Sequence, residues 1–414
     1  ISKSQKEKSG NTLFLVLHSL IFILYSCRAL FLHYSIIHFE YYFSITLVFV
    51  YMILILPRIN ILIRNSKLFL IFFTYGIFCL LISIANNGLI LSLMGFSSIF
   101  LNAFLWTYFS VFSKKKDYEI LKKVFLICMF VNAIVAIYQF YIDASFFGII
   151  SGIYGDESIM EMDNITRRSV GFMGSPQSFS ATIGVSLFVT YSLKKKHIKW
   201  PLIALFVFAG VLSNSRAFGI ALILFLILVA IKLPIWKLLI ITFGGIAAYI
   251  FASIVLNYGV FNIDTIVRTF DFSKWAAKSI YFSSFEGNGF LDCIIGRGYG
   301  LSGWNSNINS LSFDFSSTES YVTSILGEIG LIGLMIYIVW ILSLLFKNKG
   351  NKVFLFMLIY IFINSCFTPA FCGFAFSYVA WFAIVNVSKF GENLERGDIC
   401  CQKAQNLKLS RIYY

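Results

Sequence analysis

The chain has 414 residues, of which 59% are hydrophobic and only 13% are charged. A soluble domain is nearer half apolar and a quarter charged, so this composition excludes an ordinary soluble protein. The net charge of +14 is compatible with nucleic-acid binding or with the basic loops that orient a membrane protein. The distribution of the basic residues favours the second, and we expect no nucleic-acid partner.

Apolar runs long enough to cross a bilayer as helices recur along the whole sequence. A spanning helix needs about 20 apolar residues, whereas a barrel would show short alternating segments. We therefore predict an all-α, polytopic membrane protein with a single transmembrane domain over residues 1–414. The twelve predicted spans are residues 13–32, 37–56, 68–85, 89–112, 124–142, 171–193, 200–212, 217–231, 238–256, 320–346, 353–368 and 371–387.

Most basic residues fall in the connections on one side of these spans. They include "KKKDYEILKK" at 114–123, "KKKHIK" at 194–199, "KNKGNK" at 347–352 and the tail at 388–414. Because lysine and arginine accumulate on the cytoplasmic side, we expect this side, with both termini, to face the cytoplasm. The outer side holds Arg167, Arg168, Arg216, Arg268, Lys274, Lys278 and Arg297, while Arg28 stands inside the first span.

The stretch "LSNSRAFGIAL" at 212–222 interrupts a long apolar region. A single helix over 200–231 would be about 48 Å long at about 1.5 Å per residue, which exceeds the membrane core of about 30 Å. Lysines flank the region on both sides. We therefore predict a hairpin of two short spans with Arg216 at its outer turn.

Two outer loops are long, at 143–170 and 257–319. The larger precedes the tenth predicted span and is rich in aromatic residues such as Trp275 and Trp304, which argues against disorder. A long connection of this kind is usually functional. We expect short helices along the outer membrane surface.

Arginine suits phosphate because its planar guanidinium forms two charge-assisted hydrogen bonds and stays protonated. The outer arginines are therefore candidates for binding an anionic lipid-linked phosphate. The alternative is that each pairs with a lipid headgroup or a nearby acid. Arg216 is favoured for binding because its sequence neighbours are neutral and both flanks are apolar. The candidates are Arg168, Arg216, Arg268 and Arg297.

Carboxylates near the tenth predicted span are candidates for acid–base chemistry. Glu319 stands near its N-terminus, where it is either a helix-terminal charge or a general base; Glu328, deeper in the span, should face the protein interior. The glycines of "GRGYG" at 296–300 permit a tight turn or close backbone approach, but the spacing of known phosphate loops is absent. Histidines and cysteines form no ligand cluster, so we expect neither a metal nor a cofactor.

Four segments in this order resemble the O-antigen polymerase and ligase family of bacterial envelope polysaccharide synthesis. They are "RRSVGFMGSPQSFSATIG" (167–184), "LSNSRAFGIAL" (212–222), "VRTFDFSKW…LDCIIGRGYG" (267–300) and "ESYVTSILGEIGLIGL" (319–334). The resemblance covers most of residues 124–346, and it implies a GT-C-like helical fold in the bacterial inner membrane with a large periplasmic loop before span ten.

The resemblance implies a polyprenyl-pyrophosphate-linked oligosaccharide as the substrate, with no metal, and a chain-length regulator as a partner. It implies that Arg216 and Arg268 hold the pyrophosphate; Arg168 and Arg297 are weaker matches. In the implied mechanism Glu319 accepts a proton and sugars stack on Trp275. The ligase branch has a histidine near the start of the helix after the large loop, where this sequence has Glu319. That difference favours the polymerase.

Two alternatives remain at this point. A ligase would transfer finished polysaccharide to a lipid acceptor. A flippase or transporter of lipid-linked sugar would place polar sites near the bilayer midplane, often in paired broken helices, whereas the charge here gathers at one face and in one outer loop. Arg28 fits none of these roles from sequence alone.

Overall fold

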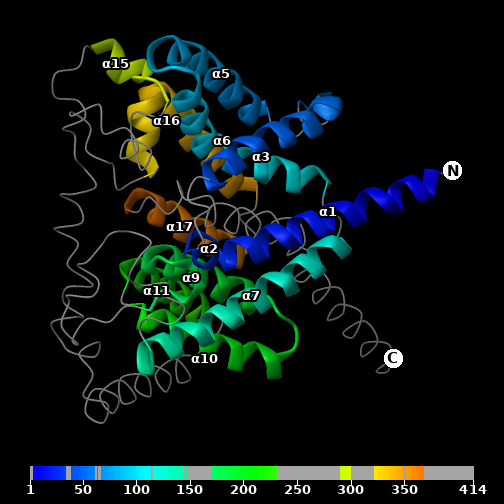
Figure 1. Ribbon diagram of the computed structural model, residues 1–414. Helices are drawn as coiled ribbons and strands as arrows, with labels where there is room; N and C mark the ends of the chain where they lie inside the picture. Colours follow the sequence, from blue (N-terminus) through cyan, green and yellow to red (C-terminus); the bar gives the residue numbers. More distant parts are fainter. Residues whose placement is uncertain are drawn as a thin grey trace, which may run out of the picture.

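The computed structural model of the protein (Figure 1) describes residues 3–33, 39–60, 63, 67–112, 115–143, 146, 169–213, 215–231, 290–299, 321–347 and 351–367. The predicted spans at 238–256 and 371–387 lie outside these residues. So do most of both long outer loops and the tail at 388–414.

Helices account for nearly all of the described residues, and no strand occurs among them. The long helices are α1 (Lys3–Ser26), α3 (Phe39–Ile55), α5 (Lys67–Asn87), α6 (Leu89–Phe112), α7 (Lys115–Tyr141), α9 (Pro176–Tyr191), α10 (Lys196–Leu212), α11 (Arg216–Ala230), α16 (Tyr321–Lys347) and α17 (Lys352–Phe367). Shorter elements are α2 (Arg28–His33), η1 (Leu56–Arg58), η3 (Gly171–Met173) and α15 (Phe290–Ile295).

The all-α prediction is confirmed for the described part of the chain, where each predicted span is occupied by helix. Three helical stretches are long and apolar enough to cross a membrane, Lys67–Asn87, Asp117–Tyr141 and Ser324–Leu344. The shorter apolar helices are Leu15–Ser26, Ile45–Ile55, Leu89–Leu101, Ala217–Ala230 and Lys352–Cys366. The protein is therefore a helical protein with candidate membrane spans; the number of twelve crossings stays a prediction.

The described helices form two groups that share one core (Figure 1). One group contains α3, α5, α6, α15 and α16, and the other contains α1, α2, α7, α9, α10 and α11. Helix α17 lies between them and contacts α16, α9 and α11. Within the second group α7 packs along α1 and α10, and α9 packs between α10 and α11.

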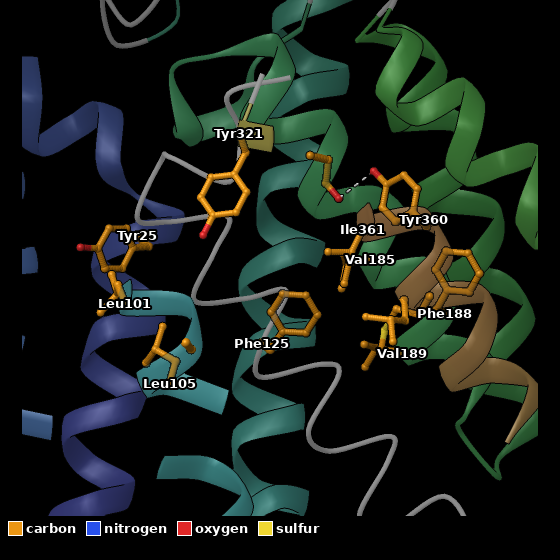
Figure 2. Close-up of a cluster of buried hydrophobic side chains, with 14 of the residues drawn as sticks. Tyr25, Leu101, Leu105, Phe125, Val185, Phe188, Val189, Tyr321, Tyr360 and Ile361 are labelled. Atoms are coloured by element: carbon orange, nitrogen blue, oxygen red, sulfur yellow. Dashed lines mark hydrogen bonds between the residues drawn. The ribbon is translucent and has the colours of Figure 1, made fainter. Parts of the chain in front are cut away.

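Buried aromatic and aliphatic side chains join the two groups, as Figure 2 shows for one part of the core. Leu101 of α6 and Phe125 of α7 lie in the same cluster as Phe188 of α9. The Phe188 ring lies 5.9 Å from the Tyr360 ring of α17, and the Tyr360 hydroxyl donates to the Ala181 carbonyl at 3.2 Å. This buried bond ties α17 to the backbone of α9.

The first predicted span, 13–32, is interrupted at Cys27 and divides into α1 and α2. The Leu30 amide donates to the Cys27 carbonyl at 3.0 Å, rather than to Ser26 as a continuous helix would require. The Ser26 carbonyl instead accepts the Asn132 side-chain amide of α7 at 3.0 Å. The interruption places Arg28 at the start of α2.

Candidate functional site

Two buried amides of α7 hold the backbone of the segment 169–173, part of the "RRSVGFMG" motif. The Gln139 oxygen accepts the Gly171 amide at 2.9 Å and the Val170 amide at 3.3 Å. Its nitrogen donates to the Gly171 carbonyl at 3.2 Å. The Asn132 oxygen accepts the Phe172 amide at 2.9 Å. Since residues seven apart lie close to one face of a helix, α7 presents both amides to this segment.

The conformation of the segment depends on a glycine. Gly171 has φ of +58°, and a Cβ there would come within 2.8 Å of the Asn132 oxygen. A left-handed conformation is readily adopted only by glycine, so the segment requires Gly171 both for its backbone and for its approach to α7. This accounts for the first glycine of "GFMGSP" without invoking a ligand.

The same segment is bonded to the end of α10. The Ser169 amide donates to the Leu212 carbonyl at 3.1 Å, and Leu212 packs with Phe140 of α7. Farther along, the Ser180 hydroxyl of α9 donates to the Ser215 hydroxyl at 2.8 Å. The residue that follows Arg168 and the residue that precedes Arg216 are therefore each fixed within one structural junction.

Arg216 is the first residue of α11, and Ser215 is its N-cap. The Ser215 side chain makes no capping hydrogen bond to α11, because its hydroxyl is bonded to Ser180. The N-cap of α9, Ser175, does accept the Ser178 amide, at 3.5 Å. A helix N-terminus carries about half a positive charge, and amides without a side-chain cap suit an anion. The start of α11 therefore combines this partial charge with an arginine.

A third segment reaches the same junction through α2. The Asn132 amide that accepts from Phe172 also donates to the Ser26 carbonyl. Beyond the turn at Cys27, buried Ala29 packs against buried Val170. We define the arginine junction as residues 26–30, 169–173, 212, 213, 215 and 216 together with Asn132 and Gln139.

A second polar region lies in the other helix group, where α16 is interrupted at Gly330. This residue has φ of 67° and ψ of −174°. Residues 296–298 lie against the interruption: the Arg297 amide donates to the Gly327 carbonyl at 3.0 Å, and the Gly298 amide donates to the Glu328 carbonyl at 3.1 Å. Over its described residues, 321–346, the predicted tenth span is thus helical except at Gly330.

The first glycine of "GRGYG", Gly296, is explained by this packing. A Cβ at Gly296 would lie 2.4 Å from the Glu328 carbonyl oxygen, and one at Gly330 would lie 2.3 Å from the Ile294 carbonyl oxygen. No side chain fits where the two backbones cross. The described part of the motif therefore binds the protein's own helix.

Tyr299 completes this region against α5. Its amide donates to the Ser83 hydroxyl at 2.8 Å, and its own hydroxyl donates to the Gly76 carbonyl at 3.0 Å. Burial raises the pKa of the Tyr299 phenol well above its usual range, which keeps the phenol protonated as a donor. Ser83 also bonds Ser92 of α6 at 2.8 Å, so α5, α6 and residues 296–299 are fixed together.

The predicted site residues are divided between described and undescribed parts of the chain. Arg297 belongs to the second polar region, on the helix group opposite Arg216, and its side chain is partly buried. Glu328 is 1% exposed, as expected for an acid facing the protein interior. Arg168, Arg268, Trp275 and Glu319 lie outside the described residues. Tyr321, two residues after Glu319, is buried and donates to the Ile99 carbonyl at 2.9 Å, which fixes the start of α16 against α6.

Asn132 and Gln139 hold the arginine junction together but were not among the residues predicted from the sequence. The sequence does contain a signal for them, because two amides stand seven residues apart inside an apolar helix, where polar side chains need partners. In the described part of the chain, no three His, Cys, Asp or Glu side chains gather as they would around a metal ion. The polar groups that the junction offers are backbone amides, hydroxyls and arginine.

No protein-family model matches the chain, and no curated protein matches its sequence. The class that the fold defines is a helical protein with apolar helices long enough to cross a membrane.

Proposed function

We propose that this protein is a membrane glycosyltransferase that joins oligosaccharide repeat units carried on polyprenyl pyrophosphate at the outer face of a bacterial inner membrane. The observation that supports the proposal most directly is the arginine junction. Two motifs that resemble the O-antigen polymerase family, around Arg168 and Arg216, adjoin one another there through the bond from Ser169 to Leu212.

The chemistry requires stabilisation of a leaving anion. A hydroxyl of one lipid-linked repeat attacks the anomeric carbon of the growing chain; a new C–O bond forms, and the bond from that carbon to the diphosphate oxygen breaks. Preorganised donors that face the developing charge lower the barrier. Arg216 and the first amides of α11 supply such donors, and Arg268 and Arg168 are proposed to add to them.

The remaining parts of the proposal concern the acceptor and its partners. Glu319 accepts the proton of the attacking hydroxyl, and Trp275 stacks on a bound sugar. The product is O-antigen or a similar surface polysaccharide, and a chain-length regulator is a proposed partner. The absence of a histidine near Glu319 favours this reaction over the ligase reaction.

Arg216 provides the decisive test. Arg216→Ala removes a cation from the leaving diphosphate, and loss of one such donor typically slows turnover about 100- to 1000-fold. We expect cells that express the variant to carry single repeats in place of long polymer. Arg216→Lys keeps the charge without the bidentate fork, so its polymer should be of intermediate abundance. The measurement is the size ladder of surface polysaccharide.

Arg58 supplies the matched control, because it lies in η1 on the side expected to face the cytoplasm. Arg58→Ala should leave the ladder unchanged. Membrane levels of each variant, measured by immunoblot, separate lost chemistry from lost insertion. A normal ladder in Arg216→Ala cells at normal protein levels would remove Arg216 from the mechanism.

A transporter of lipid-linked sugar is the second candidate, and the interruption of α16 favours it. Discontinuous helices form the substrate sites of many transporters, and buried Glu328 lies two residues before Gly330. Cells lacking the protein distinguish the candidates. A repeat stalled on the inner leaflet indicates a transporter, unattached long polymer indicates a ligase, and single-repeat surface glycan indicates the polymerase.

A further inference from the structure

Arg28 is the only lysine or arginine of the sequence that falls inside a predicted span. It lies inside the first predicted span, yet it is the first residue of α2 and its side chain is partly buried. An arginine at membrane depth is expensive unless it faces the protein interior, pairs, or lines a polar cavity. The residues that surround Arg28 in the fold therefore indicate its role.

The neighbours of Arg28 belong to the arginine junction. Ala29, fully buried, packs against Val170, which is 2% exposed; Val170 is two residues from Arg168. On the other side of Arg28, the Ser26 carbonyl shares the Asn132 side chain with the Phe172 amide, at 3.0 and 2.9 Å. The backbones on both sides of Arg28 are thus fixed to the segment that follows Arg168.

This segment is also fixed to the Arg216 hairpin. Ser169 bonds Leu212 at 3.1 Å, and Ser180 bonds Ser215 at 2.8 Å. The backbones that carry Arg28 and Arg216 are consequently both fixed to the segment 169–173, at one end of the second helix group. Two guanidinium groups in one apolar region repel each other, and an anion bound by both would offset this repulsion.

We infer that Arg28 is a further binding residue of this site and that it contacts the same anionic group as Arg216. The inference rests on the proposed function. A diphosphate carries more than one negative charge and more acceptor oxygens than a single guanidinium can satisfy, so a second fork from α2 complements the one at the start of α11. The ligand class is a polyprenyl diphosphate, bound where the lipid tail can remain among the apolar helices.

The test is direct binding of farnesyl diphosphate to the full-length protein in nanodiscs. Hydrogen bonds to charged groups correspond to about ten- to a hundredfold in affinity, so Arg28→Gln should weaken binding of the probe by that factor. Arg28→Lys should fall between Arg28→Gln and the parent chain. Arg216→Ala is expected to weaken binding similarly, and Arg58→Gln is the matched control with unchanged affinity. Farnesol, which lacks the diphosphate, should bind weakly to every variant.

Each outcome bears on one of the two claims. Unchanged affinity in Arg28→Gln and Arg28→Lys, with weakened binding in Arg216→Ala, would overturn the inference and leave the proposed function standing. A lower melting temperature of either Arg28 variant without a change in affinity would make Arg28 a structural ion-pair residue and would also overturn it. If the parent chain binds farnesyl diphosphate no better than farnesol, both the inference and the proposed function fail.

Discussion

Asn132 and Gln139 show how single polar side chains organise a helix bundle that is otherwise apolar. Each is about 1% exposed, and each satisfies backbone groups that lie outside regular helix. An unpaired buried amide costs about 1–3 kcal/mol. These two side chains therefore set where the segment 169–173 can lie.

Gln139→Met tests this role with little change in side-chain volume. The substitution removes the acceptor of the Val170 and Gly171 amides and leaves two buried donors unpaired, at about 1–3 kcal/mol each. We expect a lower melting temperature in detergent and faster hydrogen exchange of residues 169–173. Polymer formation per folded molecule should fall as well.

Asn364→Leu is the control for this prediction. Asn364 is also a fully buried amide, but its nitrogen donates to the Tyr360 hydroxyl at 3.4 Å, and Tyr360 bonds the Ala181 carbonyl of α9 rather than the segment 169–173. Its loss should lower the melting temperature without faster exchange at 169–173. Equal exchange in the two variants would show that Gln139 does not hold the segment.

For single residues, the sequence predicted the region around Arg216 but not the hydrogen bonds that fix it. The apolar flanks of "LSNSRAFGIAL" predicted a hairpin turn at Arg216, and the structure starts α11 at this residue. The sequence could not reveal that Ser215 bonds Ser180 instead of capping its own helix, because the partner of Ser215 depends on how α9 packs. The partners of Gln139 lie 31 and 32 positions away, beyond any local pattern.

Helices were predictable where apolar runs were long. The ranges predicted for 89–112 and 217–231 nearly match α6 and α11, because the membrane core requires runs of that length. The interruptions at Cys27 and Gly330 were not predicted. Each depends on hydrogen bonds from another element, Asn132 in the first case and residues 296–298 in the second.

Gly330→Ala tests the interruption of α16. The conformation of Gly330 is one that non-glycine residues adopt at a cost of about 1–3 kcal/mol, and the new Cβ would meet the Ile294 carbonyl oxygen at 2.3 Å. We expect a clear loss of thermal stability, because residues 294–296 must move away from α16.

Gly88→Ala separates the effect of a positive φ from the effect of the steric contact with Ile294. Gly88 also has a positive φ, +81°, but a Cβ there would meet no atom within 4 Å. Its melting temperature should fall less than that of Gly330→Ala. Equal losses would show that the crossing of the two backbones contributes nothing to stability.

At the scale of the whole molecule, the two ends of the helices differ in chemistry. The arginine junction gathers the C-terminal ends of α7 and α10 and the starts of α9 and α11. At the opposite ends, the Lys199 ammonium donates to the Tyr191 carbonyl at the end of α9 at 2.9 Å, and the Lys122 ammonium lies 2.9 Å from Glu119 in α7. This polarity agrees with the predicted orientation, in which the lysine-rich ends face the cytoplasm.

Cysteine accessibility tests this orientation. In a background without the eight native cysteines, single cysteines at positions 143 and 216 should react with an impermeant maleimide added outside the inner membrane. Cysteines at 196 and 352 should react only after the membrane is opened. Position 216 labelled solely from the cytoplasm would overturn the proposed site, since a periplasmic polymerase must bind its diphosphate from the outer leaflet.

Composition and hydropathy thus predicted the fold class, because a bilayer constrains helix length and polarity strongly. The association of the helices into two groups, with α17 between them, had no signature in the sequence. In an apolar chain nearly every helix face is hydrophobic, so the choice of neighbours rests on side-chain shape and on the few buried polar groups.

The bonds between residues 297–298 and 327–328 have a further consequence for how such a protein can diversify. They join the two ends of the stretch 299–326, so α15 and α16 keep the same separation whatever sequence lies between them. Lengthening a closed loop adds only about 0.6 kcal/mol per doubling. Under the proposed function, sequence changes confined to this stretch would alter which sugars are recognised and leave the supporting helices unchanged.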